Sequence, residues 1–187
     1  MIPDVAIVGG GIAGLSAALC LHARGLTVEV FEQAPEAREL GVGINLLPPA
    51  VRVLADVGLL DELVTAGIAT NELILATRRG QHIRRERRGL GAGHDTPQLS
   101  LHRGRLHGIL HRAVVARLGP EALHLGHRLE RGAQPEGRIV LGADGIHSAV
   151  RAGLFPDEGP PPWNGVMMWR GATEWPTFLD GRSMIVA

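Results

Sequence analysis

A glycine-rich segment near the start of this 187-residue chain limits its fold more than any other feature. A continuous apolar run, Val5 to Val8, is followed by Gly9, Gly11 and Gly14, which occupy the glycine positions of the pattern G-x-G-x-x-G. An unbroken apolar run is typical of a parallel strand that is buried on both faces. The pattern predicts a strand, a tight glycine turn and a helix, the arrangement that binds a dinucleotide.

The residues after the turn agree with this prediction. We expect a helix from about Ile12 to Arg24, ended by Gly25, whose first N–H groups and dipole favour a bound phosphate. A second strand is expected from Thr27 to Phe31, and Glu32 follows it. A carboxylate there can accept both hydroxyls of an adenosine ribose and repels a 2′-phosphate. The pattern therefore favours FAD or NAD over NADP.

Composition places the chain among globular α/β proteins. Hydrophobic residues make up 45% of it, and its length suffices for one domain and part of a second. The formal net charge is zero, so charge gives no indication of a nucleic-acid or membrane partner. No signal peptide precedes the first strand and no apolar run approaches the length of a membrane span, so we expect a cytoplasmic location. The single Cys20 cannot form an internal disulfide.

Helical and extended patterns alternate along the rest of the chain. A glycine-rich loop containing Arg38, Gly41 and Gly43 is expected to lead into a helix that begins near Pro49. Further helices are expected at residues 60–66 and 103–118, and short strands at residues 123–125, 138–141, 166–172 and 183–187. Residues 71–76 and 81–87 predict a hairpin that is rich in arginine. A solvated face is favoured for it over a nucleic-acid patch, because no aromatic residues interleave the arginines.

Two polar clusters allow alternative interpretations. His107 and His111 are four residues apart on an expected helix and could hold a metal, but no third ligand has a recognisable spacing, so surface histidines are favoured. Asp144, His147 and Ser148 are the residue types of a catalytic triad. Because all three stand on one turn, helix capping by Asp144 or Ser148 is the favoured interpretation.

Three signatures follow one another along the chain: GGGIAG with Glu32, LHRGRL at residues 101–106, and GADGIHSAVR at residues 142–151. Together they resemble the FAD-dependent aromatic-ring monooxygenases of the para-hydroxybenzoate hydroxylase fold, especially the salicylate and 3-hydroxybenzoate hydroxylase branch. The resemblance implies FAD as cofactor, NAD(P)H as reductant, and a small aromatic substrate that is hydroxylated with O₂. It covers nearly the whole chain, whereas the family continues well past residue 187.

The resemblance also implies which residues contact the cofactor. In that family the glycine turn and the acid hold the ADP part of FAD, and a G-x-G-I segment lies near the flavin. The family's D-G segment helps to bind FAD and is associated with NAD(P)H use. It matches Asp144, Gly145, Ser148 and Arg151 of this chain. The implied cofactor-binding residues are Gly9, Gly11, Ile12, Ala13, Gly14, Glu32, Gln33, Arg38, Gly43, Ile44, Arg103, Leu129, Asp144 and Gly145. No metal ligand is expected, and no catalytic residue is assigned.

The implied fold is an α/β, Rossmann-like FAD-binding domain over residues 1–155, with a central parallel sheet and small antiparallel elements. Residues 156–187 are expected to form a linker and the start of an incomplete substrate domain. Between Leu129 and Arg138 the chain has space only for a turn, where the family has a longer antiparallel excursion. Because the substrate-domain sheet is expected to be incomplete, strand edges and apolar surface would be left uncovered, which predicts self-association.

Three functions are compatible with these features. The first is the FAD-binding portion of an aromatic-ring hydroxylase. The second is a non-catalytic dinucleotide-binding module or remnant that needs a partner chain. The third, an NAD-dependent reductase, is disfavoured because the chain contains no tyrosine, so the Tyr and Lys pair of the short-chain dehydrogenases cannot exist.

Overall fold

The computed structural model describes residues 2–36, 41–130, 133 and 135–187. The chain divides into two compact units, one formed by residues 1–39 and 107–169, and the other by residues 40–106 and 170–187. Within the described residues, no helix is both long enough and apolar enough to cross a membrane.

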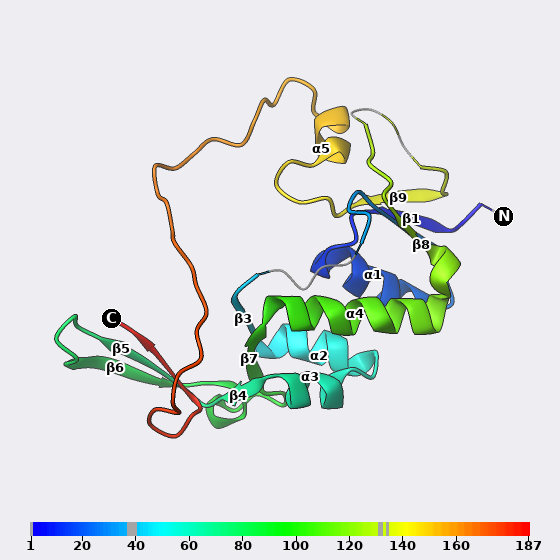
Figure 1. The fold of residues 1–187 in the computed structure, drawn as a ribbon. Coiled ribbons are helices and arrows are strands. Elements are labelled where there is room, and N and C mark those ends of the chain that lie inside the picture. Colours follow the sequence, from blue (N-terminus) through cyan, green and yellow to red (C-terminus); the bar gives the residue numbers. More distant parts are fainter. Residues whose placement is uncertain (1, 37–40, 131–132, 134) are drawn as a thin grey trace. The chain divides into compact units, whose positions relative to one another are not determined.

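The first unit is built on a parallel four-stranded sheet (Figure 1). The strand order is β8-β2-β1-β9, where β1 is Val5–Val8, β2 is Val28–Glu32, β8 is Leu123–Leu125 and β9 is Ile139–Gly142. The chain proceeds from β1 to β2 on one side and later adds β9 on the other side, so the strand order reverses beside β1. Open parallel sheets bind ligands at the carboxyl ends of their strands next to such a reversal.

Helix α1 (Ile12–His22) packs on this sheet through Leu15, Ala18 and Leu19, which are buried. It ends two residues before the expected position, in a Schellman motif. The N–H of Gly25 donates to the carbonyl of His22 at 2.9 Å, and the N–H of Leu26 donates to that of Leu21 at 3.3 Å. Gly25 has a φ of +82°, a conformation that glycine adopts without steric cost. The parallel strand, glycine turn and helix are thus confirmed.

Helix α4 (Arg103–Leu118) begins in the second unit and continues into the first. Its inward positions Leu106, Ile109, Leu110 and Val114 are almost completely buried, as the helical periodicity of the sequence predicts. The first unit also contains the short turn η2 (Pro120–Ala122) and helix α5 (Ala149–Leu154).

The second unit contains two three-stranded sheets. An antiparallel sheet has the order β3-β7-β4, with β3 at Gly43–Leu46, β7 at Gln98–His102 and β4 at Ile68–Thr70. The other has the order β10-β5-β6, in which β10 (Ser183–Val186) runs parallel to β5 (Glu72–Ala76) and β6 (His82–Arg87) antiparallel to it. Helices α2 (Pro48–Asp56) and α3 (Leu60–Ala66) and the turn η1 (Gly89–Ala92) complete the unit.

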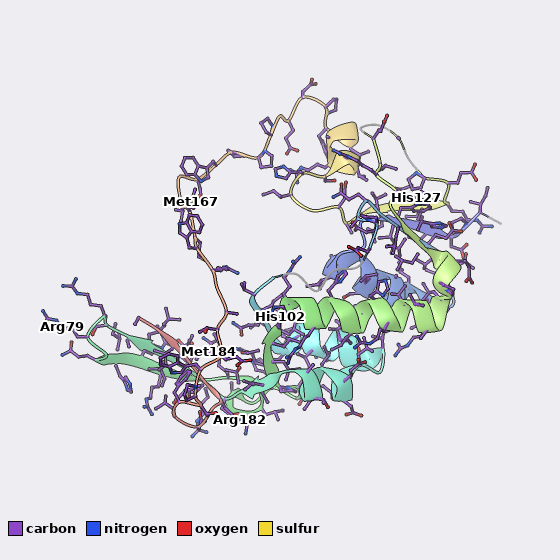
Figure 2. All side chains as sticks on the ribbon, in the orientation of Figure 1. Arg79, His102, His127, Met167, Arg182 and Met184 are labelled. Carbon is purple, nitrogen blue, oxygen red and sulfur yellow. The ribbon has the colours of Figure 1, made fainter. Side chains whose placement is uncertain are left out.

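The hairpin of β5 and β6 carries the arginines in the predicted position, with Arg79 in the connection between the strands (Figure 2). Part of the positive charge is paired locally. Glu86 contacts Arg84 at 2.9 Å and Arg88 at 2.6 Å, and Glu72 lies 3.7 Å from Arg85. All residues of β6 except Glu86 are exposed, so the arginines form a solvated hairpin face. Ion pairs at such a surface contribute little stability.

Two expectations about strands were wrong. Residues 166–172 form neither helix nor strand and are exposed on an extended segment (orange in Figure 1). Gly43 and Ile44, expected in a loop, belong to β3, where they pair with His102 and Leu101 of β7. In both cases the outcome depends on whether a distant segment supplies the ladder of backbone hydrogen bonds, which local sequence does not reveal.

The packing of α1 on β1 generates a prediction about Gly14. A Cβ atom there would overlap the carbonyl oxygen of Gly9 and lie 3.3 Å from Cγ2 of Ile7. Alanine favours a helix over glycine by roughly 1 kcal/mol, but the backbone overlap outweighs this gain. We expect Gly14→Ala to lower the free energy of unfolding by about 1–3 kcal/mol in urea titrations.

The matched control is Gly11→Ala, because no atom lies within 4 Å of a Cβ at that position. This variant should unfold within about 1 kcal/mol of the unmodified chain, since only the modest cost of alanine at a helix N-cap applies. Equal stability of the two variants would contradict the close packing of α1 on β1.

Candidate functional site

Two turns meet at the carboxyl edge of the parallel sheet. The first follows β1 and contains Gly9, and the second follows β9 and contains Ala143 and Asp144. A Cβ atom on Gly9 would lie 2.6 Å from the carbonyl carbon of Ala143 and 2.9 Å from Cα of Asp144. Only glycine therefore fits where the first turn contacts the second, and its φ of +107° requires glycine as well.

Backbone hydrogen bonds hold these turns to the neighbouring strands. The N–H of Ala143 donates to the carbonyl of Val8 at 2.7 Å, and the N–H of Gly9 donates to that of Phe31 at 2.8 Å. The ends of β9, β1 and β2 are thus tied together. The GGGIAG and GADG signatures, more than 130 positions apart in the sequence, form one continuous edge.

Glu32, the last residue of β2, points its carboxylate at this edge. One oxygen, Oε2, accepts the N–H of Gly10 at 2.6 Å, and the other, Oε1, accepts the N–H of Ala34 at 2.8 Å. An ionised carboxylate has about four acceptor positions, so each oxygen can accept a further hydrogen bond. The predicted acid therefore lies beside the glycine turn and has the capacity to accept hydroxyl groups.

The start of α1 offers hydrogen-bond donors. Gly11 is its N-cap and provides no side-chain acceptor, and the first N–H groups of a helix have no partner inside it. This places the N–H groups of Ile12, Ala13 and Gly14 at the positive end of the helix dipole. Because no atom lies within 4 Å of a Cβ built on Gly11, the backbone there is open to an approaching group.

The Asp144 segment caps helix α5. The Oδ1 of Asp144 accepts the hydroxyl of Ser148 at 2.5 Å, and its Oδ2 accepts the N–H of Ala149 at 2.6 Å. The Oγ of Ser148 accepts the N–H of Arg151 at 2.9 Å. The capping interpretation is confirmed for both residues, and the Ser148 hydroxyl, which a triad would direct at a histidine, donates to Asp144 instead.

A surface cavity of about 310 Å³ lies beside this cap and is lined by Gly142, Asp144, Gly145, Ser148, Val150, Arg151, Leu154 and Phe155. Gly145, one of the lining residues, has a φ of +80°. The guanidinium of Arg151 is bound by the carboxylate of Glu158, which raises the pKa of Arg151 and lowers the pKa of Glu158. The cap and the cavity thus share one short stretch of chain.

The remaining candidates are distributed over both units. Gln33 is exposed and Leu129 is half-buried in the first unit. Gly43, Ile44 and Arg103 belong to the second, where the N–H of Arg103 donates to the carbonyl of Val42 at 2.9 Å. Arg38 lies outside the described residues. The structure therefore brings the glycine turn, Glu32 and the Asp144 segment together, and leaves the other candidates as predictions.

The two histidines of α4, expected at the surface, are half-buried. His107 is half-buried, and its Nε2 lies 2.8 Å from the carbonyl oxygen of Gly10. The Nε2 of His111 is buried and has no hydrogen-bond partner among the described residues. Burial, together with His107 and Arg112, lowers the pKa of His111. Within the described residues no group of three or more His, Cys, Asp or Glu side chains could hold a metal ion.

Comparison with known families decides the class of this site. Residues 4–121 match the family described as FAD dependent oxidoreductase. The match spans more than half of the chain and includes β1, the glycine turn, Glu32 and α4. The chain belongs to the FAD-dependent oxidoreductases. FAD is therefore its cofactor, and the residues present fit it, because the edge combines an open glycine backbone with unpaired helix N–H groups and a carboxylate.

Among proteins of known function, this FAD-dependent oxidoreductase resembles aromatic hydroxylases. It is 44% identical to the phenazine 1,6-dicarboxylic acid hydroxylase PhzS of Lysobacter antibioticus, over 98% of this chain and 50% of that protein. It is 33% identical to the 3-amino-4-hydroxybenzoate 2-monooxygenase of Streptomyces cremeus, over 94% of this chain and 48% of that protein. The chain spans about half the length of the curated relatives it matches.

Solved structures agree. The 2-methyl-3-hydroxypyridine-5-carboxylic acid oxygenase is similar with a TM-score of 0.65 and 26% identity, over 82% of this chain and 42% of that one. The p-nitrophenol 4-monooxygenase of Pseudomonas putida has a TM-score of 0.69 at 22% identity, which supports the fold. The α/β fold class and the resemblance to flavin-dependent aromatic monooxygenases, over their N-terminal part only, are confirmed.

The roles of two residues at this edge, Gly10 and His107, were not predicted from the sequence. Gly10 occupies a variable position of G-x-G-x-x-G, yet a Cβ there would lie 2.9 Å from Cβ of Glu32. The run of three consecutive glycines was the available signal. His107 had no comparable signal, because its partner is a backbone carbonyl 97 residues earlier.

Proposed function

We propose that this chain is the FAD-binding portion of a monooxygenase that hydroxylates a small aromatic ring with NAD(P)H and O₂. The observation that carries the proposal is the contact between the glycine turn and the Asp144 turn beside Glu32, since it joins the two cofactor signatures at one edge. The similarity to aromatic hydroxylases over nearly the whole chain supports the reaction class.

The proposal gives each residue of the edge a role. The backbone at Gly9, Gly11, Ile12, Ala13 and Gly14 binds the pyrophosphate, because donors at a helix N-terminus favour anions. The Glu32 carboxylate accepts the ribose hydroxyls. The segment of Asp144 and Gly145 closes the same edge from β9. When bound, FAD supplies electron transfer from NAD(P)H and the activation of O₂, and the protein binds it and orients it.

The candidates of the second unit belong to the flavin end in this proposal. These are Gly43, Ile44 and Arg103, with Gln33, Arg38 and Leu129 completing the cofactor-binding set. The residues that bind the aromatic substrate belong to the part of the relatives that this chain does not match. A second candidate function, a dinucleotide-binding module that needs a partner chain, is favoured by the same partial coverage.

Flavin retention tests the proposal directly. The purified chain is incubated with FAD and desalted, and its visible absorbance is recorded. We expect a flavin band, and no band for Gly11→Val, whose branched side chain blocks the open backbone without meeting any neighbour within the protein at Cβ. A folded chain without the band would refute the proposal.

Turnover then separates the two candidate functions. NADH oxidation is followed with and without salicylate, the substrate class of the branch that the sequence resembles. Oxidation that salicylate accelerates supports the monooxygenase and rules out the non-catalytic module. A flavin-bound chain with no such acceleration supports the module that needs a partner.

Glu32→Ala tests the proposed ribose contact. Loss of charge-assisted hydrogen bonds should weaken FAD binding by about 1–3 kcal/mol, measured by fluorescence titration. Glu29→Ala is the matched control, because Glu29 lies on the same strand and bonds His124 at 2.9 Å instead of the glycine turn. Equal affinities for the two variants would remove Glu32 from the site.

We also propose self-association through the segment after α5. All three tryptophans of the chain lie in this segment, and Trp163, Trp169 and Trp175 are exposed to 75%, 90% and 78%. Figure 2 marks the extended part of the segment with the label of Met167. Exposed apolar surface of this extent marks an interaction region. We expect oligomers in light scattering at micromolar concentration, and a shift toward monomer in the double variant Trp169→Ser, Trp175→Ser. A monodisperse monomer before substitution would contradict this proposal.

A further inference from the structure

Gly10 is held on both sides by side chains from distant elements. Its N–H donates to Oε2 of Glu32 at 2.6 Å, and its carbonyl oxygen lies 2.8 Å from Nε2 of His107. Gly10 itself is buried. The first bond orders the peptide before Gly10 and the second orders the peptide after it, so the middle of the glycine turn cannot rotate freely.

The chemistry of the partners fixes the direction of the second bond. A carbonyl oxygen only accepts, so Nε2 of His107 carries the hydrogen and donates it. This assigns the Nε2–H tautomer, or the protonated ring, to His107. In either form the imidazole draws the Gly10 carbonyl toward α4.

The orientation of that carbonyl determines where the next N–H points. The peptide between Gly10 and Gly11 is trans, so its C=O and N–H groups point in opposite directions. When His107 holds the carbonyl toward α4, the N–H of Gly11 points away from α4. Gly11 is also the position at which a Cβ would meet no atom within 4 Å.

We propose that His107 is a positioning residue for the cofactor, which aims the N–H of Gly11 at the pyrophosphate by holding the Gly10 carbonyl. This inference rests on the proposed function, because it assigns the same edge to FAD. His107 touches no part of the cofactor in this role. It acts through one backbone peptide, and Glu32 fixes the preceding peptide of the same turn.

His111 gives the matched control. It lies one helical turn after His107, with ring centroids 6.5 Å apart, and its Nε2 has no hydrogen-bond partner among the described residues. His107→Leu removes the donor to Gly10, and His111→Leu removes a ring of the same size that makes no such bond. His107→Gln keeps an amide Nε2–H that reaches a similar position along the side chain, and should restore the bond.

Two measurements test the inference. FAD dissociation constants come from fluorescence titration of each variant. Hydrogen–deuterium exchange of the FAD-free protein reports the Gly9–Ile12 amides without any ligand. We expect His107→Leu to weaken FAD binding about three- to tenfold, the effect of one hydrogen bond, and to accelerate exchange at the turn. His107→Gln should recover most of both changes, and His111→Leu should show neither.

The outcomes separate the two proposals. If the unmodified chain binds FAD and His107→Leu binds it equally well, the positioning role is refuted while the proposed function stands. If the unmodified chain does not bind FAD, the proposed function fails and the role of His107 toward the cofactor fails with it. Unchanged exchange in His107→Leu refutes the hold on Gly10 in either case.

Discussion

The absence of side chains at Gly9 and Gly14 is the constraint on which the cofactor edge depends. A Cβ on Gly14 would overlap the carbonyl of Gly9, and a Cβ on Gly9 would press on Ala143 and Asp144. Helix α1, the end of β1 and the turn after β9 therefore meet backbone to backbone. Burial of Ile7, Leu15 and Leu19 supplies the hydrophobic stabilisation, but the missing Cβ atoms allow these elements to approach closely enough for that burial.

Polar groups complete what the glycines allow. Glu32 accepts N–H groups from Gly10 and Ala34, so the carboxylate proposed to bind the ribose already stabilises the turn that is proposed to bind the pyrophosphate. A ligand that binds only the folded chain stabilises it by mass action. Because one carboxylate serves both purposes, the order of the turn and the affinity for FAD are expected to change together.

Sequence reasoning located what depends on local pattern. The apolar run, the glycine spacing and the acid at the end of β2 follow from short-range rules, and so does helix α3, whose observed bounds match the expected ones. It failed where the partner is distant. Gly43 becomes part of a strand only because β7 lies opposite, and residues 166–172 form no strand despite a strand-like sequence. The role of His107 could not be predicted for the same reason, since nothing near it in the sequence indicates that it contacts a carbonyl of the glycine turn.

The three exposed tryptophans are large apolar side chains that the described fold leaves outside its hydrophobic core. Burying one tryptophan removes about 150–250 Å² from water, which at about 25 cal/mol per Å² contributes on the order of 4 kcal/mol or more. For Trp163, Trp169 and Trp175 together this is comparable to the whole net stability of a typical domain, about 5–15 kcal/mol. A polypeptide surface that covers the three would gain this hydrophobic free energy, which is offset by the entropy lost when two surfaces associate and their side chains become fixed. The first unit needs no such cover for its cofactor edge, because β1, β2, β9, α1 and His107 of α4 already make the contacts that hold the glycine turn. Substitutions in the tryptophan-containing segment after α5 are therefore expected to leave the cofactor edge intact.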